Sequence, residues 1–197
     1  MKKIMIIVVL AVCAGTTSLA QDSNFAMTYS MGFATGDLGD FISAPSFRGA
    51  ALDYRYSIQP NLALGLNFGM NTFYEEQANG TYTNDNASIS GKQYRYSNHV
   101  PMLATATYFL KPGETLGPFG TLGIGTMYTR RNTDMNLYTI EQEAWNFVVQ
   151  PEIGIQYKVV DNMAIHFSAK YMLGFEAGDE LPETQSFISL NIGLAFF

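Results

Sequence analysis

The sequence is poor in cysteine, in basic residues and in long apolar runs. Its single cysteine, Cys13, cannot form an intrachain disulfide, so other interactions must hold the fold. The 11 lysines and arginines are outnumbered by 17 acidic residues. Without a basic patch to replace phosphate counterions, nucleic acid is excluded as a partner. After the first 20 residues no apolar stretch approaches the ~20 residues of a membrane helix, which excludes helical spans.

The N-terminal segment has the three parts of a secretory signal peptide. Two lysines precede an apolar run, and small residues precede Gln21. We expect cleavage after Ala20, which gives a signal peptide over residues 1–20 and one domain over residues 21–197. A membrane anchor is the alternative, but the apolar run is too short for it, and the bulky Val12 before Cys13 disfavours a lipoprotein site. Removal of the two lysines leaves a net charge of −8.

Apolar residues are abundant but dispersed. They make up 47% of the chain, with 14% aromatic residues and 18 glycines, and they alternate with small or polar residues at a period of two. This pattern predicts eight strands, near residues 25–35, 48–57, 62–74, 94–110, 119–129, 145–157, 164–175 and 187–197. Polar loops are expected over residues 36–46, 75–92, 130–143 and 176–185, and short turns between the other strands.

Alternation alone does not say which face is inside. A soluble lipocalin-like barrel would line a ligand pocket with the apolar face. Here the other face is mostly Gly, Ala, Ser, Thr and Asn, small enough for a narrow barrel interior and too poorly charged for a soluble exterior. Long loops at one end and short turns at the other also favour a barrel in a bilayer.

Large aromatic residues of the apolar face gather near the strand ends. Two such belts around an aliphatic band of ~25 Å are typical of a membrane barrel. The belt at the short turns comprises Phe25, Tyr54, Tyr56, Tyr108, Tyr157 and Phe196, and the belt at the long loops comprises Phe33, Tyr74, Tyr94, Tyr96, Tyr128, Trp145, Phe147 and Phe175. The sequence therefore predicts an all-β, eight-stranded, antiparallel up-and-down transmembrane barrel.

The chain resembles the small outer-membrane β-barrel proteins of the OmpX/OmpA-like class, in the style of the Bacteroidetes. The resemblance rests on the signal peptide, the eight alternating strands, the turns YSIQPNLALG and YKVVDNMAIH, the stretch PFGTLGIG and the aromatic C-terminus. It implies a location in the Gram-negative outer membrane, contact with lipid and lipopolysaccharide, and insertion by the barrel-assembly machinery. That machinery commonly recognises a terminal aromatic residue, which makes Phe196 and Phe197 the candidate insertion signal, with Phe196 in phase with the lipid-facing residues.

Five charged or titratable residues are expected inside the barrel: Asp53, Arg55, Glu152, His166 and Lys170. A turn centred on Asp161 places Glu152 opposite Lys170, which predicts a cross-strand ion pair. The simplest interpretation is mutual neutralisation in a solid polar core, and the alternative is a proton path or gated pore. His166 and Ser168 match the spacing of outer-membrane lipid A deacylases, but both should point inward. His99 has no evident nucleophile nearby and is interpreted as structural.

These patterns favour a non-enzymatic barrel with a role in envelope integrity or in surface interaction through its extracellular loops. The alternatives are a narrow channel or carrier for small solutes and a lipid A-modifying enzyme. No motif for a cofactor or metal ion is present, and the surface ligand is not defined by the sequence.

Overall fold

The computed structural model describes residues 23–84, 87–135, 138–177, 181 and 183–197. The expected signal peptide over residues 1–20 lies outside them. In chain order the described elements are β1 (Ser23–Thr35), α2 (Gly36–Phe41), β2 (Ser46–Gln59), β3 (Leu62–Asn84), β4 (Ala87–Phe109), β5 (Leu116–Met135), β6 (Tyr138–Val160), β7 (Met163–Gly174) and β8 (Gln185–Phe196). No helix among the described residues is long and apolar enough to cross a membrane.

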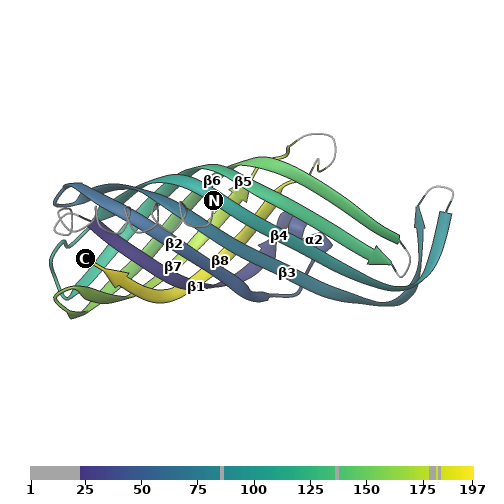
Figure 1. The fold of residues 1–197 in the computed structure, drawn as a ribbon, viewed down its shortest axis with the longest axis horizontal. Helices are drawn as coiled ribbons and strands as arrows, with labels where there is room; N and C mark the ends of the chain where they lie inside the picture. The colour runs from purple at the N-terminus through teal and green to yellow at the C-terminus, as the bar shows by residue number, and fades with distance from the viewer. Residues whose placement is uncertain (1–22, 85–86, 136–137, 178–180, 182) are drawn as a thin grey trace, which may run out of the picture.

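The eight strands form a closed antiparallel barrel in sequence order, as predicted (Figure 1). β8 closes it by pairing with β1 along its length, from Phe25 opposite Phe196 to Thr35 opposite Ser186. Gly193 permits this close approach, because a Cβ atom there would collide with the carbonyl oxygen of Met27. Closure removes the free edges of the sheet, which lipid could not satisfy.

The two faces of each strand separate as the alternation predicts. In β2, Asp53 and Arg55 are buried inside the barrel, whereas Leu52, Tyr54 and Tyr56 are exposed on its outer face. The terminal strand behaves in the same way, with Ser189, Asn191 and Ala195 buried and Ile188, Leu190 and Leu194 exposed. The apolar face is thus the exterior of the molecule, which excludes the lipocalin-like arrangement.

The short turns lie at one end of the barrel, here called the short-turn end, together with the C-terminus (Figure 1). The β2–β3 connection is Pro60–Asn61, and the β6–β7 connection is Asp161–Asn162. The longer β4–β5 connection contains Gly113, whose φ of 81° is a left-handed conformation that glycine adopts without strain. The opposite end is called the long-hairpin end.

At the long-hairpin end, the prediction of polar loops is wrong for two segments, which the structure forms as strands. Residues 75–84 and 87–92 continue β3 and β4, whose pairing extends to Asn84 opposite Ala87, and β4 begins at Ala87, well before Tyr94. Residues 130–135 and 138–143 likewise extend β5 and β6, as far as Met135 opposite Tyr138. Beyond the lipid-facing wall both faces of a strand meet polar surroundings, so the apolar alternation stops although the hydrogen-bonded ladder continues.

The predicted polar loop over residues 36–46 also differs from expectation, because it contains α2. This short helix lies inside the barrel mouth at the long-hairpin end, against β8 and β1 (Figure 1). Leu38 of the helix and Ile42 just after it have no exposed surface. They pack in an apolar cluster with Phe73, Leu103, Met127, Val148, Met172 and Phe187.

Candidate functional site: the filled barrel interior

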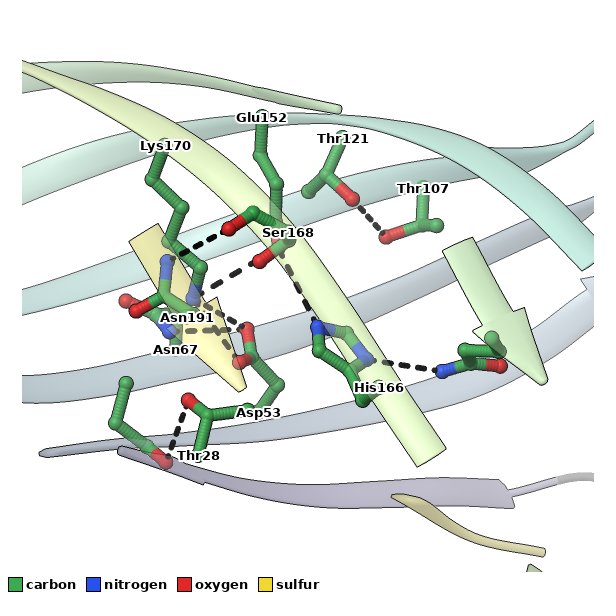
Figure 2. Close-up of polar contacts among 12 residues, drawn as sticks. Thr28, Asp53, Asn67, Thr107, Thr121, Glu152, His166, Ser168, Lys170 and Asn191 are labelled. Atoms are coloured by element: carbon green, nitrogen blue, oxygen red, sulfur yellow. Dashed lines mark hydrogen bonds and ion pairs between the residues drawn. The ribbon is translucent and has the colours of Figure 1, made fainter. Parts of the chain in front are cut away.

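The five predicted interior residues lie together in the barrel and are called the charged layer. β2 supplies Asp53 and Arg55, β6 supplies Glu152, and β7 supplies His166 and Lys170, each at most 3% exposed. Figure 2 shows Lys170 reaching toward Asp53 from the opposite wall. Because β2 and β7 are not neighbours in the sheet, this contact crosses the interior.

The pairing of the charged layer differs in part from the predicted ion pair. Glu152 is opposite Lys170 in the β6–β7 ladder, as the turn position predicts. The Nζ of Lys170, however, lies 3.0 Å from Oδ2 of Asp53 and 3.9 Å from Oε1 of Glu152. Asp53 also accepts a hydrogen bond of 2.9 Å from the amide of Asn67. The closer carboxylate is therefore on β2, which a prediction limited to one hairpin does not include.

Arg55 completes the neutral arrangement of two carboxylates and two cations. One of its terminal nitrogens lies 3.6 Å from both Asp53 and Glu152, and its guanidinium covers the ring of Phe119 at 4.8 Å. Removing four charges from water is costly unless they compensate one another, and here each cation faces both carboxylates. The layer thus places four fixed charges across the barrel interior.

His166 and Ser168 point into the barrel, but they do not form a nucleophile–base pair. His166 contacts Gln156, with 3.3 Å between Nδ1 and Nε2, and its Nε2 faces Glu152 at 3.8 Å (Figure 2). Within the described chain, no hydrogen bond joins His166 to Ser168. A catalytic pair needs its two side chains within hydrogen-bonding reach.

His99 has a nucleophile beside it, contrary to the prediction. The hydroxyl of Ser97 lies 2.9 Å from Nε2, and the hydroxyl of Thr129 lies 3.4 Å from Nδ1. Residues two apart on one strand share a face, which is the sequence signal for this pair. Ser97 and His99 have no exposed surface, and the rings of Phe73 and Phe187 pack against His99 at centroid distances of 5.6 and 5.3 Å. The environment matches a structural histidine.

The apolar cluster, which lies on the long-hairpin side of the charged layer, was not predicted. Its wall residues come from β3 to β8, and Leu38 and Ile42 close it at the long-hairpin end. Leu38, Phe41 and Ile42 have the spacing of a helical face, a signal hidden among the glycines and aspartates of residues 36–40. The lumen is thus occupied by two unlike layers, one charged and one apolar.

Residues 36–44, here called the lid, are held in the barrel mouth by polar contacts from three sides. Asp37 accepts hydrogen bonds from the backbone N–H and the hydroxyl of Thr184, at 2.9 and 2.7 Å. Glu75 of β3 accepts hydrogen bonds from the backbone of Ser43 and Ala44. Both carboxylates accept hydrogen bonds from backbone N–H groups outside the strands, which the strand ladders do not satisfy.

Two arginines extend these contacts over the helix. Arg95 donates a hydrogen bond of 2.8 Å to the carbonyl oxygen of Phe41, and its guanidinium lies 5.0 Å from the ring centre. Arg131 lies 4.1 Å from the same ring and pairs with Glu183 at 2.6 Å. Phe41 is therefore covered by two cations at the rim of the barrel.

The predicted aromatic belts lie on the outer face. At the short-turn end, Phe25 is opposite both Tyr54 and Phe196 across neighbouring strands. At the other end, Tyr128 and Trp145 pack at 5.3 Å between ring centres, and Phe147 stacks with Phe175 at 5.9 Å. Phe197 follows the end of β8 and donates its N–H to the carbonyl of Asn162.

A model of the outer membrane protein beta-barrel domain family matches residues 4–196. The chain belongs to this family. It is an outer-membrane protein whose exposed apolar face contacts lipid.

Among the described residues, no group of three or more His, Cys, Asp or Glu side chains that could hold a metal ion is found.

Solved structures of outer-membrane barrels resemble the chain in fold. Neisserial surface protein A is 15% identical, with a TM-score of 0.57 over 88% of this chain and 96% of its own. OprG from Pseudomonas aeruginosa is 12% identical, with a TM-score of 0.53 over 89% and 95%. The outer membrane protease OmpT from Escherichia coli is 8% identical, with a TM-score of 0.51 over 90% and 97%. No curated protein sequence matches the chain.

Proposed function

We propose that this outer-membrane barrel is non-enzymatic and non-conducting, and that it serves envelope integrity or surface interaction through its long hairpins. The observation that carries the proposal is the projecting β3–β4 ladder. It continues from Asn71 opposite His99 to Asn84 opposite Ala87, whereas the pairing of β2 with β3 ends at Gly49 opposite Asn71. The long hairpins are on the extracellular side and the short turns in the periplasm.

The projecting hairpins have strand edges that offer backbone groups to a partner. Beyond Asn71 the described pairing of β3 is with β4 alone. In the second projecting hairpin, formed by β5 and β6, the edge belongs to β6. The strand β7 pairs with β6 only as far as Gly174 opposite Val148, while β6 continues to Tyr138. Strand edges of this kind can bind an extended chain through their backbone groups.

The filled interior supports the absence of transport. Any solute would have to displace the lid, pass the apolar cluster and cross the charged layer, whose members are at most 3% exposed. An eight-stranded barrel is just wide enough for its own side chains. Enzymatic activity is disfavoured because His166 and Ser168 are not joined, and because Ser97 and His99 lie beneath the lid.

The test is to replace residues 77–93 with an Asn-Gly turn, which joins Glu76 to Tyr94, a pair already opposed in the ladder. Attachment of cells displaying the protein to immobilised extracellular-matrix and serum proteins is measured. Truncation should abolish attachment, whereas the interior variant Glu152→Gln should retain it. Unchanged attachment after truncation contradicts the surface role. Conductance steps in planar bilayers that change with Glu152→Gln would instead support the channel alternative.

A further inference from the structure

The apolar cluster has the form of a chamber with a removable cover. Its wall consists of six buried side chains on the strands: Phe73, Leu103, Met127, Val148, Met172 and Phe187. The space between them is filled by Leu38 and Ile42 of the lid. The wall belongs to the hydrogen-bonded barrel, whereas the lid is a connecting segment between β1 and β2. The lid can therefore leave the chamber without breaking the barrel.

The lid is attached to the rim mainly through side-chain contacts. Asp37 accepts from Thr184, Glu75 accepts from Ser43, and Arg95 donates to the carbonyl of Phe41. Each is a contact of modest net strength that water can replace. Local opening of such a segment requires much less than unfolding of the barrel.

Two arginines lie at the rim of the chamber, among the carboxylates that hold the lid. Arg95 and Arg131 both lie over Phe41, and Arg131 is only 4% exposed. The Nε of Arg131 has no hydrogen-bond partner within the described part of the chain. Its acidic partner, Glu183, is half-exposed. Guanidinium groups bind carboxylate and phosphate oxygens strongly, so the two arginines can receive an anionic group at the mouth of an apolar space.

We propose that the chamber is a binding site for a single-chain anionic amphiphile. Its hydrocarbon tail takes the place of Leu38 and Ile42 among the wall residues, and its head meets Arg95 and Arg131. Two aliphatic side chains of this size correspond to a tail of about eight carbon atoms, since burial of apolar groups scales with the methylenes removed from water. This site is separate from the hairpin tips and does not depend on the proposed surface role.

The methionines provide a direct test with an internal control. Met127 and Met172 line the chamber, whereas Met27 and Met70 are 56% and 53% exposed on the outer face. Methyl-labelled methionine in the full barrel, embedded in lipid nanodiscs, is observed by NMR while octanoate is added. The Met127 and Met172 signals should shift saturably, and those of Met27 and Met70 should follow only the gradual partition of octanoate into lipid. Octan-1-ol and butyrate, which lack the head charge and the tail respectively, should bind at least ten-fold more weakly.

Three variants separate the parts of the proposal. Leu38→Ala empties part of the chamber and should tighten octanoate binding about ten-fold. Asp40→Asn, an exposed carboxylate on the same helix, is the matched control and should leave binding within two-fold. Arg95→Gln should remove most of the preference for octanoate over octan-1-ol. Retention of the folded barrel in each variant is checked by its faster migration on unboiled gels.

Two results overturn the proposal. If Met127 and Met172 do not respond saturably to octanoate in either the wild-type protein or Leu38→Ala, the chamber is not a binding site. If octan-1-ol binds as well as octanoate in the wild-type protein, the site does not recognise an anionic head. Loss of attachment on hairpin truncation is measured separately, so failure of one proposal leaves the other intact.

Discussion

At the scale of single residues, the charged layer depends on charges that compensate one another across the barrel. Lys170 lies 3.0 Å from Asp53, and Arg55 lies 3.6 Å from each of Asp53 and Glu152. None of these side chains is more than 3% exposed, so water cannot replace a missing partner. Removal of one charge leaves another uncompensated, whereas removal of an opposite pair leaves the layer neutral.

Lys170→Met should lower the free energy of unfolding by about 3 kcal/mol, because Asp53 loses its closest cation. Asp53→Leu should have a similar effect, and the double variant should cost at least about 1 kcal/mol less than the sum of the two. Urea unfolding in lipid vesicles, followed by the fluorescence of Trp145, the only tryptophan, measures these changes.

The matched control for this prediction is Lys92→Met. Lys92 pairs with Glu76 on the exposed β3–β4 hairpin, where both side chains are at least 42% exposed. Exposed pairs contribute little, so this variant should change stability by no more than about 0.5 kcal/mol. Strictly additive effects of Asp53→Leu and Lys170→Met would contradict compensation across the interior.

At the scale of elements, the lid differs from the strands in what holds it. The strands are held by ladder hydrogen bonds, and the lid by buried Leu38 and Ile42 together with carboxylates such as Asp37. The side-chain hydrogen bond from Thr184, followed by its backbone N–H, lowers the pKa of Asp37 below its ordinary value of 3.8. Arg131 lowers the pKa of Asp37 further through its charge.

The lid contact of Asp37 should weaken in acid. Because the pKa is lowered in the folded state, the stabilisation is fully present at neutral pH and is lost as the pH falls through the folded-state pKa, below 3.8. The amide NMR signal of Thr184 should therefore titrate with a midpoint below that value. The step should vanish in Asp37→Asn and persist in Asp40→Asn. A midpoint at or above 3.8 in the wild-type protein would be inconsistent with this hydrogen bond.

At the scale of the whole molecule, closure of the barrel assigns unlike positions to the two terminal phenylalanines. Phe196 is opposite Phe25 of β1 and Met163 of β7, with its side chain on the outer face. Phe197 lies beyond β8 and makes a backbone hydrogen bond to Asn162. Phe196 thus belongs to the closing seam, and Phe197 extends the chain past it.

We expect Phe196→Ala to reduce assembly more than deletion of Phe197. Truncation of the aromatic ring at Phe196 removes its contacts across the β1–β8 seam and in the aromatic belt, whereas loss of Phe197 removes one backbone contact. The fraction of heat-modifiable barrel in isolated outer membranes measures assembly. Failure of assembly without Phe197, together with normal assembly of Phe196→Ala, would assign the insertion signal to Phe197.

The sequence by itself determined the eight strands, their inward and outward faces, the short turns and the pairing of Glu152 opposite Lys170. These features depend on local alternation and on one tight turn, which a single strand or hairpin already specifies. The same alternation also indicated that the apolar face is external, because the other face carries too few charges for a soluble surface.

Only the tertiary structure decided what fills the barrel. The choice of Asp53 as the nearest partner of Lys170 depends on the distance across the barrel between strands that are not neighbours in the sheet. The place of Leu38 and Ile42 among six strands depends on such distances as well. The length of the hairpins was likewise hidden, because a ladder in polar surroundings needs no apolar alternation. Contacts across a closed barrel join residues far apart in the chain, and no local pattern encodes their distance.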